Sequence, residues 1–187
     1  MILVVDMNSK KNPFGVFEFV LPIVSIAEKL EKCTVKHYLE VNEKSIDDYD
    51  EIILSGSALK DTVTFDQIAR FKWLKECDKP VFGICAGMQT IGLVFGGRVE
   101  KCLEIGMTEI VTSKENVLFS STFKVYALHN YALVPSAEFE VLAESESCVH
   151  AIRHRYKDLY GVLFHPEVRN KEFVERFINT FSVNRRI

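Results

Sequence analysis

Several features that mark specialised protein classes are scarce or missing in this sequence. Its 187 residues include only 5 prolines, 9 glycines and 1 tryptophan, without internal repeats or low-complexity stretches. Lys and Arg number 23 against 26 Asp and Glu, so no basic excess points to nucleic acid. The longest apolar stretch, 16–27, contains a glutamate and a proline and is too short to span a bilayer. Disordered, collagen-like, nucleic-acid-binding and membrane-spanning proteins are therefore poor fits.

The cysteines lack the pattern of a disulfide-stapled or metal-bound protein. They are odd in number and include no Cys-x-x-Cys pair: Cys33, Cys77, Cys85, Cys102 and Cys148. This spacing argues against a disulfide framework and against a structural zinc site, so no metal is expected. The N-terminal apolar run 2–5 has no positive region before it, so it is not a signal peptide. We therefore expect a cytoplasmic protein.

Hydrophobic residues make up 48% of the chain, and they form two alternating patterns in its first half. Short apolar or alternating segments predict strands at 2–5, 35–39, 51–54 and 80–84. Helical spacing predicts helices at 16–32, 65–75 and 86–95. Pro22 is expected to kink or bound the first of these, and Asp61 or Thr64 to cap the second.

The second half of the chain has mostly strand character. Strands are predicted near 107–111, 123–128, 139–143, 148–153 and 159–164. A last helix is predicted from a cap at Asn170 to about Phe181. Strands alternating with helices predict parallel pairing through right-handed crossovers. The prediction is one α/β domain, 1–187, with an open mixed, mostly parallel sheet flanked by helices.

The most informative stretch is Gly83-Ile84-Cys85-Ala86-Gly87, where a predicted strand leads directly into a predicted helix. A sharp turn there exposes the central side chain and crowds its neighbours, so small residues are needed two positions to either side. The adjacent helix N-terminus favours thiolate over thiol. A lone cysteine is more often a small core residue. The two glycines and the strand-to-helix context instead predict that Cys85 is a nucleophile.

A cysteine nucleophile generally needs a base, and the base needs an orienting group. His165 follows the apolar run 159–164, at the carboxyl end of a predicted strand where catalytic groups gather in open α/β sheets. Pro166 turns the chain, and Glu167 can then fold back toward the imidazole. These residues predict a Cys85–His165–Glu167 triad, with a surface turn as the alternative. Three other histidines are predicted to be structural or solvent-facing: His37, His150 and His154.

Acyl transfer also needs N–H donors for a tetrahedral oxyanion. The backbone N–H of Ala86, directly after the nucleophile, is one candidate. The second is expected in the turn Ser55-Gly56-Ser57, which follows the predicted strand 51–54. A plain small-residue turn explains that composition equally well.

Two motifs together resemble the class I (triad-type) glutamine amidotransferase domain. Residues 83–89 read GICAGMQ and residues 160–168 read YGVLFHPEV, in the order that the family shows. The resemblance covers almost the whole chain. It implies the family's α/β fold and a glutaminase reaction. In that reaction a thiolate attacks the side-chain amide of L-glutamine, ammonia leaves, and water releases glutamate from a γ-glutamyl thioester.

The resemblance also implies a role for each site residue. Cys85 would be the nucleophile, His165 the general base and then acid, and Glu167 the orienting group. Backbone N–H groups of Ser57 and Ala86 would form the oxyanion hole. Three further residues would bind the substrate: Gln89, Asn130 and Tyr131.

The chain departs from the family's pattern at two places. Where members usually carry Gly-Gly-Pro or Gly-Pro-Gly, it reads Gly56-Ser57-Ala58. Ser57 keeps the N–H, but a positive φ would cost energy there, so we expect this hole to form only on activation. Residues 128–131, Leu-His-Asn-Tyr, stand where GMP synthetases typically show Ser-His-x-Asp. Asn130 and Tyr131 can still supply backbone contacts.

The ammonia acceptor is expected on another chain. The sequence ends soon after the last predicted helix, which leaves no room for a synthetase domain. Residues 105–110, IGMTEI, resemble the Ile-Gly-Trp-Thr-Glu segment of GMP synthetase amidotransferase domains. This favours a glutaminase subunit that delivers ammonia to a separate synthetase subunit making GMP from XMP. No cofactor is expected in this chain, because ATP and magnesium would bind the partner.

Other functions remain open on the sequence alone. The enzyme alternatives are a subunit of anthranilate or aminodeoxychorismate synthase and a stand-alone γ-glutamyl hydrolase. A binding or regulatory module with a relic triad belongs to a different class, and Ser57 is the one feature that favours it. Neither nucleic acid nor a membrane is an expected partner.

Overall fold

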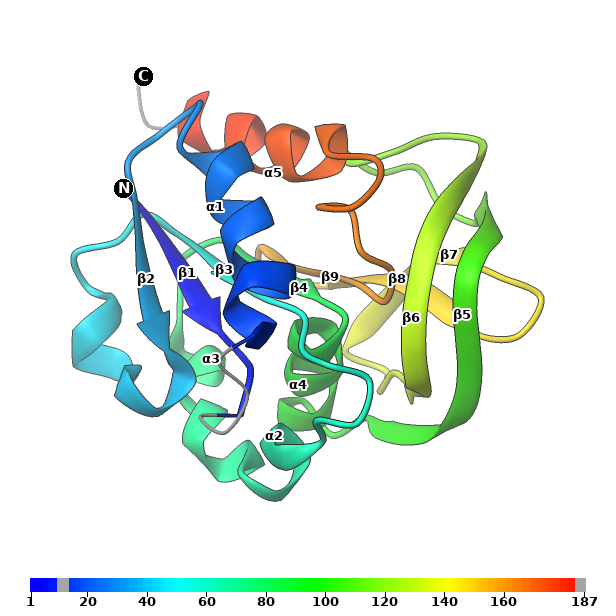
Figure 1. Ribbon diagram of the computed structural model, residues 1–187, viewed down its shortest axis with the longest axis horizontal. Coiled ribbons are helices and arrows are strands. Elements are labelled where there is room, and N and C mark those ends of the chain that lie inside the picture. Colours follow the sequence, from blue (N-terminus) through cyan, green and yellow to red (C-terminus); the bar gives the residue numbers. More distant parts are fainter. Residues whose placement is uncertain (10–13, 184–187) are drawn as a thin grey trace.

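The computed structural model describes residues 1–9 and 14–183 (Figure 1). Its strands form one nine-stranded sheet in the order β2-β1-β3-β4-β9-β8-β7-β5-β6. The strands are β1 (Ile2–Asp6), β2 (Cys33–His37), β3 (Glu51–Leu54), β4 (Val81–Ile84), β5 (Arg98–Thr112), β6 (Thr122–Val134), β7 (Phe139–Glu144), β8 (Val149–His154) and β9 (Leu159–Val162). Parallel pairings join β2, β1, β3, β4 and β9, and antiparallel pairings join the others. The predicted α/β fold with a mixed sheet is confirmed.

Helices cover both faces of the parallel half, which explains why its strands are continuous apolar runs. Alternate residues of a strand point to opposite faces, so Ile2 and Val4 of β1 join one core while Leu3 and Val5 join another. The first core includes α1 (Leu21–Ala27) and α5 (Glu172–Val183). The second includes α3 (Trp73–Glu76) and α4 (Ala86–Val94), and α2 (Val63–Asp66) lies beside α4. Among the helices described, none is long and apolar enough to cross a bilayer.

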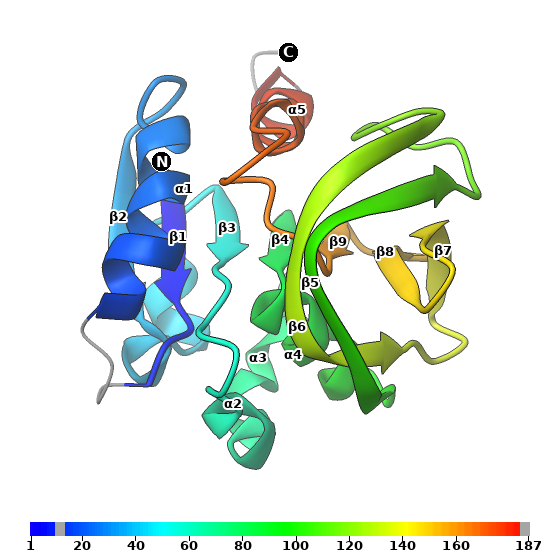
Figure 2. The same cartoon turned by 45° about the vertical axis from the view of Figure 1, so that its right-hand side comes forward.

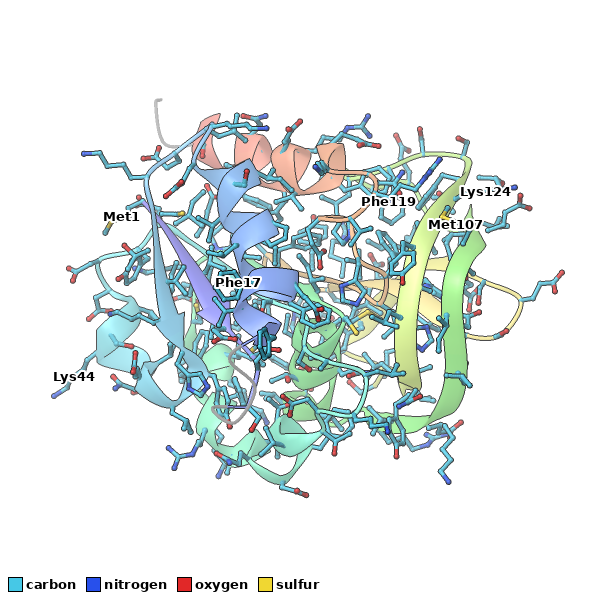
Figure 3. The ribbon with its side chains drawn as sticks, viewed as in Figure 1. Met1, Phe17, Lys44, Met107, Phe119 and Lys124 are labelled. Carbon is cyan, nitrogen blue, oxygen red and sulfur yellow. The ribbon has the colours of Figure 1, made fainter. Side chains whose placement is uncertain are left out.

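The antiparallel half curls, and this brings β6 back toward the middle of the sheet. Figure 2 shows the long β5–β6 hairpin arching beside β8 and β9. The N–H of His165, just after β9, donates to the Tyr126 carbonyl of β6 at 2.9 Å. Phe119, between the two hairpin strands, has its ring centroid 5.4 Å from that of Phe173 on α5, while Met107 and Lys124 lie on the outside (Figure 3). The curl places the inner face of β6 beside the strand ends of the parallel half.

Three helix predictions need correction. The predicted helix 16–32 is a π-helical turn over Val16–Val20 followed by α1, with Pro22 in the first turn of α1, where a proline is tolerated. The predicted helix 65–75 is instead three short pieces, α2, a 3-10 turn at Ile68–Phe71 and α3. It breaks because Gln67 leaves helical geometry, at φ −113° and ψ 19°. Asn170 has φ 71°, whereas an N-cap is extended, so it does not cap α5.

Candidate active site

Cys85 lies in the sharp turn between β4 and α4, with φ 48° and ψ −101°. A non-glycine residue in a sparsely populated region costs about 1–3 kcal/mol and persists only where its surroundings hold it. Here the Cys85 N–H donates to the Val162 carbonyl of β9 at 2.7 Å. A Cβ on Gly87 would stand 2.5 Å from the Leu54 carbonyl oxygen, and one on Gly83 2.6 Å from the carbonyl carbon of Gly87. The crowding predicted for the two glycines is present.

His165 and Glu167 form a buried pair next to this turn. The imidazole Nδ1 lies 2.7 Å from the Glu167 Oε1, and the residues are 0% and 2% exposed. Because the carboxylate accepts, Nδ1 carries the proton in this contact and Nε2 is left for the thiol. Nε2 has no hydrogen-bond partner among the described residues. The predicted turn at Pro166 therefore brings the carboxylate to the imidazole.

The charges around His165 favour its protonated form. Burial lowers the pKa of His165, but the Glu167 carboxylate and then the Cys85 thiol raise it by more. The net pKa lies well above the ordinary value for histidine. The thiol itself is 3.7 Å from the Leu128 carbonyl of β6. The imidazole is thus poised to be an imidazolium beside a sulfur that can hold negative charge.

The turn after β3 passes directly beside the imidazole. A Cβ on Gly56 would lie 2.6 Å from Cε1 of His165, so only glycine permits this approach. The neighbouring Ser57 is not among the described non-glycine residues with positive φ, which are Cys85, Ser121 and Asn170. The strain expected at Ser57 is therefore absent from this conformation. Its hydroxyl donates to the Asp61 carbonyl at 3.3 Å.

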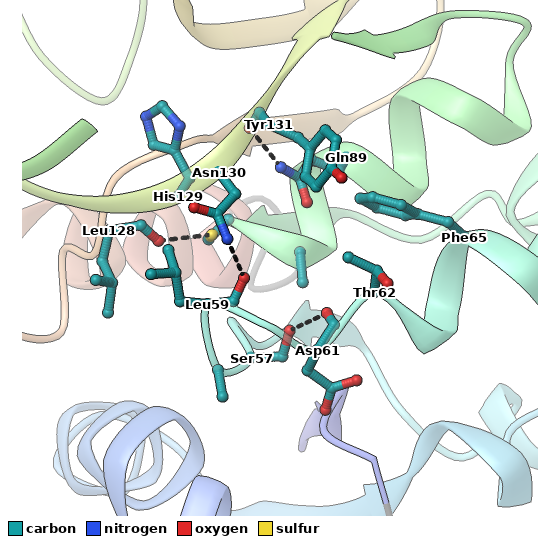
Figure 4. A pocket seen from close by; sticks show the side chains of 13 residues that line it. Ser57, Leu59, Asp61, Thr62, Phe65, Gln89, Leu128, His129, Asn130 and Tyr131 are labelled. Carbon is teal, nitrogen blue, oxygen red and sulfur yellow. Dashed lines mark hydrogen bonds between the residues drawn. The ribbon is translucent and has the colours of Figure 1, made fainter. Parts of the chain in front are cut away.

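A pocket of about 280 Å³, partly open to solvent, lies over Cys85 (Figure 4). Residues 57–62 form one wall and residues 128–131 another. Two hydrogen bonds hold these walls. Gln89 Nε2 donates to the Tyr131 carbonyl at 2.7 Å, and Asn130 Nδ2 donates across the pocket to the Leu59 carbonyl at 2.8 Å.

The structure brings the predicted site residues together. The pocket lining includes Cys85 and the five predicted oxyanion or substrate residues Ser57, Ala86, Gln89, Asn130 and Tyr131. The lining also includes residues that the sequence did not indicate, among them Leu59, Phe65 and Leu128. Leu59 and Leu128 act through backbone carbonyls, so their side chains carry no signal of that role. Phe65 contacts Tyr131 edge-on, with ring centroids 5.8 Å apart.

The histidines outside the pair have other partners. Half-buried His37 bonds the Asn8 carbonyl through Nε2 at 2.8 Å. His154 is buried, with its ring 4.7 Å from that of Phe95. His150 is fully buried against Glu104. Of the two alternatives predicted for His150 and His154, the structural one holds.

Comparison with known proteins gives the family of this site. The sequence model of the family Glutamine amidotransferase class-I matches residues 21–184. The chain belongs to this family. As predicted, it is a glutamine-hydrolysing amidotransferase.

Relatives within this amidotransferase family include one of the subunits of glutamine-hydrolyzing GMP synthase from three organisms. The Methanothrix thermoacetophila protein is 31% identical, over 91% of this chain and 93% of the relative. The Methanosphaera stadtmanae protein is 34% identical, over 81% and 88%. The Methanocaldococcus jannaschii protein is 38% identical over 109 residues, which are 54% of this chain and 58% of that protein.

Solved structures show the same amidotransferase fold. A Thermoplasma acidophilum protein, assigned to the same kind of GMP synthase subunit, superposes with a TM-score of 0.85 at 24% identity, covering 99% of this chain and 95% of that one. A glutamine amidotransferase from Thermotoga maritima superposes with a TM-score of 0.69 at 18% identity, covering 98% and 83%.

Proposed function

We propose that this chain is the glutaminase subunit of a two-subunit GMP synthetase. It hydrolyses L-glutamine at Cys85 and passes ammonia to a separate synthetase subunit that converts XMP to GMP. The observation that carries the proposal is the buried His165–Glu167 pair beside the strained Cys85, at the base of a pocket. The names of the relatives support GMP synthetase as the acceptor.

The geometry supports a two-step acyl transfer. Cys85 Sγ attacks the side-chain carbonyl carbon of glutamine, and the amide oxygen becomes an oxyanion that accepts from the N–H groups of Ala86 and Ser57. His165 Nε2 gives its proton to the nitrogen, which leaves as ammonia and forms the γ-glutamyl thioester. A water molecule then gives a proton to His165, attacks the thioester and releases glutamate with the Cys85 sulfur. Glu167 keeps the imidazole in position and stabilises its charged form.

The outer part of the pocket would bind the α-amino and carboxylate ends of glutamine. Gln89, one helical turn beyond Cys85, is fixed by its bond to the Tyr131 carbonyl. Asn130 is fixed by its bond to the Leu59 carbonyl. We propose these two side chains, with the Tyr131 backbone, as the substrate contacts. The hydrolysis needs only the thiol, imidazole and carboxylate, so ATP and magnesium are assigned to the partner.

An exposed apolar stripe on β5 is the surface that we assign to the synthetase subunit. Leu103, Ile105 and Met107 are 66%, 60% and 52% exposed on the outer face of this strand. Contiguous exposed apolar surface of this kind marks interaction sites. Leu103 also lines a hollow with Asn130 and Tyr131, which continues to the glutamine pocket. A partner on this stripe would thus stand beside the ammonia source.

A cytoplasmic location accompanies this proposal. All five cysteines are free thiols, which suits a reducing compartment.

The test is glutamate release by the chain alone and with a synthetase subunit supplied with XMP and ATP. We expect strong stimulation by the loaded partner and stoichiometric GMP formation. Ile105→Lys should reduce the stimulation without changing basal release, whereas Val35→Lys on β2, at the opposite end of the sheet, should change neither. Glutamate release that no XMP-loaded partner alters would reject GMP synthetase as the acceptor and favour a stand-alone hydrolase.

A further inference from the structure

A second cluster of chemically reactive side chains lies on the inner face of the curled half of the sheet. Glu104 comes from β5, His129 from β6, and His150 from β8, while Cys148 stands just before β8. Each residue offers one atom that could bind a metal, and these atoms all lie within 4.8 Å of one another. His129 and His150 are buried, and the other two are half-buried. The proposed glutaminase mechanism uses none of the four.

The Glu104 Oε2 is the centre of the cluster. It lies 2.6 Å from His150 Nε2, 3.1 Å from His129 Nε2 and 3.8 Å from Cys148 Sγ. Four tetrahedral ligands of Zn²⁺, at about 2.0–2.3 Å from the ion, stand about 3.3–3.6 Å from each other. Side-chain shifts of about one ångström would therefore place all four atoms around a single ion.

The protons on His129 leave a place for a cation. Its Nδ1 is 3.0 Å from the Cys102 carbonyl, which can only accept, so Nδ1 carries the hydrogen. Its Nε2 then points at the Glu104 carboxylate, which also only accepts. A neutral imidazole has one N–H and cannot serve both acceptors. Either a second proton or a metal ion must stand between Nε2 and Oε2.

The cluster also has the supporting contacts that metal ligands ordinarily have. A ligating histidine usually donates its other N–H to a carbonyl or carboxylate, and a ligating carboxylate is itself hydrogen-bonded. The Cys102 carbonyl does this for His129. The Ser145 hydroxyl donates to Glu104 Oε1 at 3.0 Å, which leaves Oε2 directed at the other ligands. A plain histidine–glutamate pair needs no thiol, so Cys148 favours the metal over the second proton.

The ligand types select the metal. Two imidazoles, one thiolate and one carboxylate suit Zn²⁺ far better than Mg²⁺ or Ca²⁺, which require oxygen ligands. Four protein ligands with no place for water are typical of a structural rather than a catalytic zinc site. An ion could enter from a surface groove of about 770 Å³ that is lined by Cys102, Ser145 and Cys148.

We propose that Glu104, His129, Cys148 and His150 bind one Zn²⁺ ion that ties β5, β6 and β8 together. The sequence did not indicate this site because its ligands come from four separate segments and include no Cys-x-x-Cys pair. His129 lies between Leu128 and Asn130, which line the glutamine pocket. The ion would therefore also steady one wall of that pocket. This proposal does not depend on the identity of the ammonia acceptor.

Metal analysis of the purified chain tests the proposal directly. Protein stripped with a chelator and reloaded with Zn²⁺ should retain one ion per chain after gel filtration, as measured by plasma mass spectrometry. Loading with Co²⁺ should give the visible bands of a tetrahedral site and a near-ultraviolet thiolate-to-cobalt charge-transfer band. Zn²⁺ should also raise the Tm. Retention of less than a tenth of an equivalent of zinc would overturn the proposal.

Matched cysteine variants separate this site from adventitious binding. Cys148→Ser should remove the charge-transfer band and weaken Zn²⁺ binding by about 100-fold or more, beyond the effect of losing a supporting contact. Cys148→Asp, which restores a ligand, should recover Zn²⁺ binding without that band. Cys33→Ser, at the far end of the sheet, should behave as the wild type. Equal zinc affinity in Cys148→Ser and Cys33→Ser, with circular dichroism showing both folded, would contradict the assignment.

Discussion

The turn that carries Cys85 and the pocket wall formed by residues 57–62 and 128–131 face each other, but different interactions hold them. The turn is fixed by covalent neighbours and by backbone contact, with no room for a Cβ at Gly83 or Gly87. The wall is held by single hydrogen bonds over long sequence separations, such as Asn130 to Leu59. One such bond contributes about 1 kcal/mol, so the wall can change at small cost.

This difference suits a glutaminase that must wait for its partner. The nucleophile and its base have to stay in register in every state, and buried close packing provides that. The oxyanion turn and the substrate wall need to respond to docking, and a lightly held segment provides that. Ser57 fits this division, because its resting backbone is unstrained and its N–H has yet to be organised into a hole.

Removal of the nucleophile should have the largest effect. Cys85→Ala should lower glutamate release by about 10⁴-fold or more, because no other group can form the thioester. The fold should persist, because alanine keeps the Cβ and fits the same backbone. Thermal unfolding and a glutamate dehydrogenase-coupled assay measure the two effects. Cys33→Ser is the control and should keep full activity; a variant of Cys85 that still turns over glutamine would exclude the triad.

The buried pair should separate into unequal parts. His165→Asn should cost about 10²–10⁴-fold by removing proton transfer. Glu167→Gln should cost less, because the imidazole remains. Negligible losses in both variants would mean that residues 165–167 are only a turn.

Titration of His165 sharpens the same comparison. The carboxylate raises the pKa of His165, so Glu167→Gln should lower that pKa and move the alkaline loss of activity to lower pH. The pair stabilises the fold most below about pH 6.5, the unfolded value, and this contribution is lost as the pH rises through the folded pKa. Imidazole chemical shifts in the two proteins, with Cys85→Ala added, measure the change. An unchanged pKa in Glu167→Gln would contradict the electrostatic role.

A methyl group at the interface between the two regions should have an intermediate effect. Gly56→Ala places a Cβ against Cε1 of His165 and forces the imidazole or the turn to move. Displacement of a catalytic group by about 1 Å can cost about 10²-fold. We expect a loss of that order in kcat with the thiol still reactive toward iodoacetamide. Wild-type kcat would show that the turn has slack at this point.

The wall should respond to the residue at the oxyanion turn. If the active hole requires a positive φ at Ser57, a serine there costs about 1–2 kcal/mol more than glycine. Ser57→Gly should then raise basal glutamate release by up to about tenfold and reduce the stimulation by partner. Basal release no faster than that of the wild type would place the barrier to activation elsewhere.

Local motifs explain what the sequence could predict. Residues 83–87 and 165–167 each fall within a few positions of one strand end, so strand assignment alone located the nucleophile, base and carboxylate. Leu128, Asn130 and the Glu104 cluster reach their places through the curl of the β5–β6 hairpin, which depends on contacts among distant strands. Residues 65–75 looked helical because the apolar spacing is correct, yet the break at Gln67 has no local sequence signal.

Covalent labelling with the glutamine analogue 6-diazo-5-oxo-norleucine tests the central claim most directly. The analogue should react once per chain, in competition with glutamine, and peptide mass spectrometry should find the label on Cys85. Cys85→Ala should take up no label while the other four cysteines remain present. A label on Cys33, Cys77, Cys102 or Cys148, or labelling that glutamine does not suppress, would contradict the claim that Cys85 is the nucleophile of a glutaminase.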